Sequence, residues 1–380
     1  MKCIINGKVI LADKVCENLA IVFDDKIRKI ADVQSINKAD YEIIDAGGNY
    51  VAPGLVDMHI HGFLGADVSD GDVEGIKVMA EGIIKNGVTS WCPTTMTVSK
   101  AEIEAAFDAV RTVKNSGTYY GSRILGVNSE GPFINPSKKG AQAEEHILRP
   151  DADFIIKHSD LVKLFTVAPE VDGALECIEK VKANTNVLVS MGHTDASYEE
   201  AVEGINKGVS HTTHLFNAMT ALSHRSPGVV GAALSDDGVS VELIADTFHV
   251  SKGLFNMVAK LKGEKLCLIT DCIRAGGMPD GDYTLGGQPL HKEGIKCLMP
   301  DGTIAGSVLN LNEAVRNLYE NSKLEIYDAV ACASLNPAKA LGVDDEVGSI
   351  DEGKRADIII VDDKFNVFTT ILDGEVRYTK

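Results

Sequence analysis

The feature that most constrains the fold of this chain is a regular alternation of short apolar runs with longer helical patterns. Eight apolar runs occur, and each ends in polar or small residues. They are YVAPGLVDMH (50–59), VTSWCP (88–93), RILGVNSEGP (123–132), VKLFTVAPE (162–170), VLVSMGHTDA (187–196), VSHTTHLFNAM (209–219), VSVELIADTFH (239–249) and LCLITD (266–271). Runs bounded in this way predict buried strands, and their alternation with helices predicts a parallel sheet.

The segments between the runs carry the helical patterns. They are clearest at 72–86, 99–115, 171–183, 197–207 and 251–262. Ser99 stands where an N-cap is expected, and Gly208 stands where a C-cap is expected. Eight strands alternating with helices over about 250 residues predict an α/β fold, a (β/α)8 TIM-type barrel, which we assign to residues 53–345. A doubly wound open sheet is the alternative, but no G-x-G-x-x-G motif follows the first run to favour it.

The two ends of the chain have a different pattern. Short alternating runs such as MKCIINGKVI and ADIIIVDDKFNVFTTILDGEVRYTK predict antiparallel strands with tight turns. We therefore expect residues 1–52 and 346–380 to form one small β-domain beside the barrel. Two last helices are expected near 308–320 and 326–341, before the tail. The glycine-rich segment 272–307 is expected to form a lid or hairpin over the site.

Charge and cysteine usage restrict the partners of the protein. The formal net charge of −18 argues against nucleic acid or an anionic membrane, and no run of about 18 apolar residues occurs. Eight scattered cysteines without a C-x-x-C pair predict reduced, mostly buried thiols. The first residues do not resemble a signal peptide, so a cytoplasmic location is expected.

Residues that can bind a metal or transfer a proton stand at the ends of the predicted strands. They are His59, His61, Glu130, His193, His214 and Asp271. The carboxyl ends of barrel strands meet on one face, and residues i and i+2 of a strand point to the same side. Imidazoles and carboxylates gathered there suit Zn²⁺ or Fe²⁺ with an open position for water. Taken singly, each has an ordinary structural interpretation, such as a core histidine or a turn cap; their joint placement favours a metal site.

The remaining histidines receive different predictions. His211 is three residues from His214 and is interpreted as structural. His249 follows the seventh strand and is expected to contact substrate. The others stand in polar contexts and are expected to be solvated; they are His146, His158, His224 and His291.

Several motifs resemble known families. PGLVDMHIHG and the tail NPAKALGVDDEVGSIDEGKRADIIIVD are similar to the amidohydrolase superfamily. Within it, EGPFINPSKKGA, MGHTDA, THLFNAM and IADTFHV resemble the N-acetylglucosamine-6-phosphate deacetylase family, in this order and across nearly the whole chain. The resemblance implies a barrel with a β-sandwich built from both termini, and commonly a homodimer in which some phosphate contacts cross the interface.

The resemblance also implies roles for particular residues. Glu130, His193 and His214 would hold the main divalent metal, while His59 and His61 offer a second site, so that one or two ions of zinc or iron are expected. Asn217, the Ala218 backbone, Arg225 and His249 would bind a sugar phosphate, and Ile304 would line the acetyl pocket. Gln142 stands where some members carry a histidine that positions the substrate, which leaves the recognised sugar open.

The implied reaction is metal-dependent hydrolysis of the acetamide of N-acetylglucosamine 6-phosphate to glucosamine 6-phosphate and acetate, in amino sugar catabolism or cell-wall recycling. We hypothesise that Asp271 takes the proton of the attacking water and delivers it to the departing amine. Alternatives are the N-acetylgalactosamine 6-phosphate deacetylase reaction, another amidohydrolase reaction, and a non-catalytic scaffold, which would be expected to lose the metal ligands.

Overall fold

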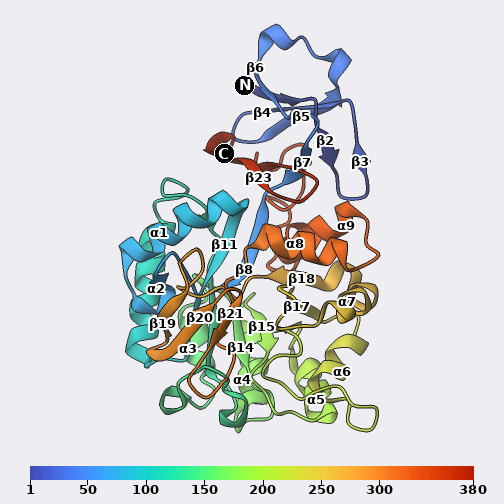
Figure 1. The fold of residues 1–380 in the computed structure, drawn as a ribbon. Helices are drawn as coiled ribbons and strands as arrows, with labels where there is room; N and C mark the ends of the chain where they lie inside the picture. Colours follow the sequence, from blue (N-terminus) through green and yellow to red (C-terminus); the bar gives the residue numbers. More distant parts are fainter.

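The structure is a computed structural model that describes residues 1–380. Parallel strands form the centre of its larger part, with helices around them (Figure 1). The barrel strands are β8 (Leu55–Ile60), β11 (Val88–Thr95), β13 (Val127–Phe133), β14 (Val162–Val167), β15 (Leu188–Met191), β16 (His211–Thr212), β17 (Ser240–Ile244) and β18 (Leu266–Ile269). They pair in chain order, and a bridge between Ile60 and Cys272 closes the ring. The predicted (β/α)8 barrel is confirmed.

The helices that cover the barrel are α1 (Val73–Ile83), α2 (Lys100–Lys114), α3 (Ala152–Lys157), α4 (Ala174–Asn184), α5 (Tyr198–Lys207), α6 (Gly228–Ser235), α7 (Phe255–Lys262) and α8 (Leu311–Glu320). Six of these eight helices match predicted segments, while α3 and α6 were not predicted. Ser99 caps α2 in a capping box with Glu102, and Gly208 ends α5. The strands and helices enclose one apolar core that includes Trp91 and Phe165.

The helix predicted at 326–341 is two helices, α9 (Ile326–Ala331) and α10 (Leu335–Ala340). Pro337 has no N–H with which to reach the carbonyl of Ala333, so a continuous helix would lose a hydrogen bond there. The chain breaks instead at Ser334, whose φ of −139° is not helical.

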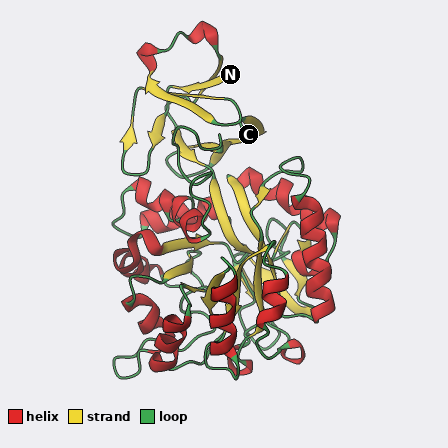
Figure 2. Ribbon diagram, turned by 180° about the vertical axis from the view of Figure 1, so that it is seen from behind, coloured by secondary structure: helices red, strands yellow, loops and turns green.

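The two chain ends form a pair of sheets at the top of the molecule (Figures 1 and 2). One has the order β5-β4-β1-β6 and the other β24-β23-β22-β7-β2-β3. Their strands are β1 (Lys2–Ile5), β2 (Lys8–Ile10), β3 (Val15–Cys16), β4 (Leu19–Phe23), β5 (Ile27–Asp32), β6 (Glu42–Asp45), β7 (Tyr50–Pro53), β22 (Ile358–Val361), β23 (Val367–Leu372) and β24 (Glu375–Thr379). Because β22 pairs with β7, both termini build this β-sandwich, as the resemblance implied. The domain boundaries at 52/53 and 345/346 stay a prediction.

Two details of the terminal strands differ from the prediction. The pairs β1–β6 and β2–β7 are parallel rather than antiparallel, because the later strand of each pair runs in the same direction as the earlier one. The run 50–59 is not one strand, because β7 belongs to the sandwich and β8 to the barrel. Gly54 joins them where any larger side chain would collide with the side chain of Thr89.

The segment after β18 forms a three-stranded antiparallel sheet beside the mouth of the barrel (Figure 1). Its strands are β19 (Gly281–Leu285), β20 (Gln288–Glu293) and β21 (Lys296–Leu298). Leu285, at the end of β19, and Ile304, which follows β21, line the cavity described below. No helix in the structure has the length and apolar character needed to cross a membrane.

Candidate metal centre

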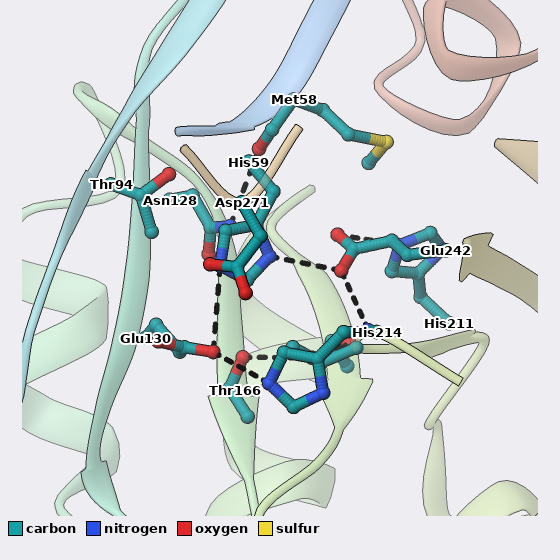
Figure 3. A network of polar contacts seen from close by, with 12 residues as sticks. Met58, His59, Thr94, Asn128, Glu130, Thr166, His211, His214, Glu242 and Asp271 are labelled. Carbon is teal, nitrogen blue, oxygen red and sulfur yellow. Dashed lines mark hydrogen bonds and ion pairs between the residues drawn. The ribbon is translucent and has the colours of Figure 1, made fainter. Parts of the chain in front are cut away.

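The six polar residues predicted at the strand ends converge on one point. Figure 3 labels four of them, His59, Glu130, His214 and Asp271. The six residues form two buried groups, one of His59, His61 and Asp271 and one of Glu130, His193 and His214, with the donor atoms of each group within 4.8 Å of one another. Glu130 on β13 belongs to the second group and also contacts the first. Its Oε1 is 2.9 Å from Nε2 of His214, and its Oε2 is 3.2 Å from Nε2 of His61.

The backbone at three of these residues has an unusual conformation. His193, His214 and Asp271 have φ values of 47°, 28° and 50°, in the left-handed region that non-glycine residues seldom adopt. Such residues cost of order 1–3 kcal/mol each and persist where the surroundings hold them. Here the amide of Asp271 donates to the carbonyl of His59 at 2.9 Å, a contact that also closes the barrel. The chain thus turns sharply after its strands and brings the side chains into the mouth.

Backbone carbonyls determine the tautomers of two of the histidines. Nδ1 of His61 is 3.2 Å from the carbonyl oxygen of Thr94, and Nδ1 of His193 is 2.9 Å from that of Lys138. A carbonyl oxygen only accepts hydrogen bonds, so each Nδ1 carries the proton. In the neutral ring, Nε2 then presents a lone pair to the centre.

A carboxylate does the same for His59. Its Nδ1 lies 2.9 Å from Oε2 of Glu242, a buried residue in the middle of β17. Nε2 of His59 therefore faces Nε2 of His61 at 3.2 Å and the nearest oxygen of Asp271 at 3.5 Å. Lone pairs and carboxylate oxygens at these distances repel one another unless a cation lies between them or the rings are protonated.

The electrostatics of the centre favour a bound cation. Burial acts to raise the pKa of Glu130, but the neighbouring His59 and His193 hold that pKa well below its usual range, so Glu130 is a carboxylate. Burial acts to lower the pKa of His59, yet Glu242 and Glu130 raise it to about 9. The surrounding carboxylates thus favour a positive charge at the Nε2 atoms, carried either by a proton or by a metal ion. Nitrogen and oxygen donors of this kind fit a divalent ion such as Zn²⁺ or Fe²⁺.

A cavity of about 370 Å³ opens above the two groups, a volume suited to a small molecule. Five residues predicted to contact substrate line it; they are Gln142, Asn217, Ala218, His249 and Ile304. His249 is held by Asp246, whose Oδ2 is 2.6 Å from Nδ1 of the histidine.

The structure does not place Arg225 in this cavity. Arg225 lies in the exposed stretch 221–226 and makes no hydrogen bond or ion pair within the chain. Lys138 is instead the single lysine or arginine among the lining residues, and its Nζ is 3.2 Å from Asp195. The predicted phosphate set is therefore brought together only in part within one chain.

Some functional positions were not found from the sequence. Glu242 was not singled out, although a charged residue inside the apolar run VSVELIADTFH was a usable signal. His158 was predicted to be solvated, which is wrong: it is 8% exposed and packs its ring against Phe107 and Phe154. His211 is buried outside the two groups, with Nε2 3.2 Å from Glu242, which agrees with a structural role.

Comparison with known proteins identifies the family. Residues 50–377 match the model of the amidohydrolase family. The chain belongs to this family. Among its relatives, the N-acetylglucosamine-6-phosphate deacetylase of Bacillus subtilis (strain 168) is 37% identical over 362 residues, 93% of this chain and 91% of the relative. The N-acetylgalactosamine-6-phosphate deacetylase of Escherichia coli O157:H7 is 34% identical over 359 residues, 93% of this chain and 95% of the relative.

Solved structures agree with this assignment to the amidohydrolase family. The crystal structure of N-acetylglucosamine-6-phosphate deacetylase from Pasteurella multocida superimposes with a TM-score of 0.94 at 31% identity and covers 100% of both chains. Membership of the amidohydrolase family and the two buried donor groups together support a divalent metal at the centre.

Proposed function

We propose that this amidohydrolase hydrolyses the acetamide of N-acetylglucosamine 6-phosphate to glucosamine 6-phosphate and acetate. The observation that carries the proposal is the convergence of histidine Nε2 atoms and carboxylates under a cavity of about 370 Å³, in a chain whose relatives are named for this reaction. Glu130, His193 and His214 would hold one ion, and His59, His61 and Asp271 a second. Zinc or iron is the metal that these donors suit.

A divalent ion held there would polarise the acetamide carbonyl and lower the pKa of a water molecule toward ~7. Asp271 lies at the base of the cavity, its nearest oxygen 3.2 Å from Nε2 of His61. We propose that Asp271 accepts the proton of the attacking water. An amide nitrogen leaves poorly unless it is protonated, so Asp271 would then deliver the proton to the departing amine.

The residues around the cavity would orient the sugar. Asn217, the Ala218 backbone and His249 would bind the phosphate, and Ile304 would contact the acetyl methyl group. We further propose a homodimer in which Arg225 of one subunit reaches the phosphate in the cavity of the other. The exposed position of Arg225 and its lack of a partner within the chain support this, and so does the need of a chain with net charge −18 for local positive charge. The reaction is proposed to be cytoplasmic; the eight free cysteines, seven of them buried, support this.

A second candidate is the deacetylation of N-acetylgalactosamine 6-phosphate, because one relative carries that name. The two substrates differ only in the configuration at one hydroxyl. Gln142, where some family members have a histidine, is the lining residue whose identity bears on this choice.

One experiment separates these reactions. Metal-replete protein is assayed with the 6-phosphates of N-acetylglucosamine and N-acetylgalactosamine, with the unphosphorylated sugars as controls, while bound metal is measured. We expect the highest kcat/KM for N-acetylglucosamine 6-phosphate and a large loss for the sugars without phosphate. Absence of activity on both phosphosugars would overturn the proposal.

A further inference from the structure

The side chain of Glu242 is a carboxylate completely enclosed at the barrel centre, with 0% of the residue exposed. It comes from the middle of β17 and lies beside the two donor groups without belonging to either (Figure 3). Oε2 accepts from Nδ1 of His59 at 2.9 Å and from the backbone amide of His214 at 2.9 Å. A charge buried this deeply is costly unless its partners compensate it, so its contacts indicate its role.

Glu242 gives His59 a property that the other histidines of the centre lack. Nδ1 of His61 and Nδ1 of His193 donate to backbone carbonyls, of Thr94 and Lys138. His59 alone donates from Nδ1 to a charged side chain. A carboxylate on the outer nitrogen of a metal-binding imidazole fixes its tautomer and orientation, and it makes the inner nitrogen a stronger donor.

The same oxygen of Glu242 connects the two groups. Through the ring of His59 it contacts the first group, and through the amide of His214 it contacts the second. His214 is in the left-handed backbone conformation, with φ of 28°, so this hydrogen bond also holds a strained residue. The link to His214 is to the backbone only, whereas the link to His59 is to the ring that would bind the ion.

His211 completes the arrangement from the side away from the centre. Its Nε2 is 3.2 Å from Oε1 of Glu242, and its Nδ1 is 2.6 Å from the hydroxyl of Ser240. Oε1 is thereby occupied, which leaves Oε2 directed to His59 and His214. Residues of β16, β17 and β8 thus form one continuous chain of hydrogen bonds ending at the first donor group.

We propose that Glu242, held by His211, is the positioning residue of the ion site formed by His59, His61 and Asp271, and that it enables the centre to hold a second ion. The inference rests on the metal centre put forward under the proposed function. It concerns ion binding and is tested without substrate, so its failure is distinguishable from failure of the deacetylase assignment.

The test counts ions in the Glu242→Ala and Glu242→Gln variants of the full chain. Zinc binding is measured by elemental analysis after dialysis and by competition with a chromogenic chelator. Loss of a residue that orients a metal-binding histidine typically weakens metal affinity about 10- to 100-fold. We expect Glu242→Ala to weaken the binding of the ion at His59, His61 and Asp271 by about 100-fold. The other ion should be weakened much less, because Glu242 contacts only the backbone of His214. Glu242→Gln retains a hydrogen-bond acceptor for His59 but loses the negative charge. It should weaken the affinity for the ion at His59, His61 and Asp271 by about tenfold.

Two comparisons make the result specific. Asp246→Asn is the matched control, because Asp246 is also a buried carboxylate that contacts Nδ1 of a histidine, His249, outside both groups. It should keep both ions at wild-type affinity. The double variant Glu242→Ala with His59→Ala should bind the second ion no more weakly than His59→Ala alone, because Glu242 acts on that ion through the ring of His59.

Several results would overturn the proposal. These are wild-type protein that binds a single zinc at saturation, a Glu242→Ala variant with both affinities unchanged, and a variant in which both ions weaken equally. If Glu242→Ala does not fold, Glu242→Gln decides the matter. A selective loss at one ion supports the positioning role, and unchanged affinity at both ions contradicts it.

Discussion

Gln142 is hydrogen bonded to Glu130. Its side-chain Nε2 donates to Oε2 of the carboxylate at 2.7 Å, while its Oε1 accepts from the backbone amide of Thr97 at 2.6 Å. The side-chain amide of Gln142 is therefore held between Thr97, just after β11, and Glu130, which contacts both donor groups. We predicted Gln142 as a substrate-binding residue; it lines the cavity, and its two polar atoms are both engaged by the protein.

This contact predicts the effect of replacing Gln142. In Gln142→Ala, Glu130 loses a hydrogen bond to a charged group, and we expect kcat to fall about tenfold or more because a net contribution of about 1.5–3 kcal/mol to its orientation disappears. Ser137→Ala is the control, since Ser137 lines the same cavity and bonds only to Asn135. Equal kcat in the wild type and Gln142→Ala would show that Glu130 does not need this clamp.

Asp271 provides a prediction about the proton transfer. Asp271→Asn keeps the size of the side chain but cannot accept a proton, so turnover should fall by about 10²- to 10⁴-fold. Zinc at Glu130, His193 and His214 should remain, because Asp271 belongs to the other donor group. Steady-state kinetics and metal analysis on the same preparation check both parts. Near-normal turnover would remove Asp271 from the mechanism.

His193 provides a prediction about metal binding. His193→Ala removes one of three donors from the group of Glu130, His193 and His214, so the protein should lose the zinc of that group. His224→Ala is a suitable control because His224 is exposed and makes no contact with the centre. Elemental analysis after dialysis measures the difference. Full metal content in His193→Ala would exclude it as a ligand.

Arg123 links the barrel to the chain's C-terminal strands. Its guanidinium, on the short strand β12 (Arg123–Ile124), bonds to Asp357 and Asp373, and Asp357 is only 5% exposed. Arg123→Ala leaves that carboxylate buried and unpaired, which should lower the free energy of unfolding by about 3–5 kcal/mol.

Chemical denaturation measures this effect of Arg123. Arg111→Ala is the control: Arg111 pairs with Asp108 and Asp160, both well exposed, and its loss should cost less than about 1 kcal/mol. If the two variants had the same denaturation midpoint, the buried network would not contribute to stability.

His158 predicts a pH dependence of stability. Burial, with Lys157 nearby, lowers the pKa of His158 in the folded protein. The unfolded chain therefore binds the proton more readily, and the contribution of this residue is present at pH above its unfolded pKa of about 6.5 and lost as the pH falls through it. His158→Leu should lose less stability than the wild type between pH 7.5 and 5.5.

Urea midpoints at the two pH values test this expectation, because all other titrating groups are common to both proteins. Replacement of the exposed His224 by Leu should leave the pH dependence as in the wild type. If His158→Leu had the same pH dependence as the wild type, burial of His158 would not lower its pKa in the folded protein.

Several features of the site were accessible from the sequence because they are local. The spacing of His59 and His61 places both rings on one side of a strand, and polar residues that end apolar runs meet where parallel strands meet. The division of 50–59 into two strands was not accessible. It depends on pairing between distant strands, because β7 pairs with β2 and β22 in the sandwich and β8 pairs with β11 in the barrel.

The sequence by itself determined the barrel, a small β-domain built from both termini and the face on which the donors gather, because hydrophobic periodicity and strand ends are properties of neighbouring residues. The tertiary structure decided which atom of each donor faces the centre. That choice depends on hydrogen bonds between residues far apart in the chain, as from His59 to Glu242 and from Gln142 to Glu130. Only the closed barrel brings such partners within 3 Å of each other, and a hydrogen bond requires that proximity.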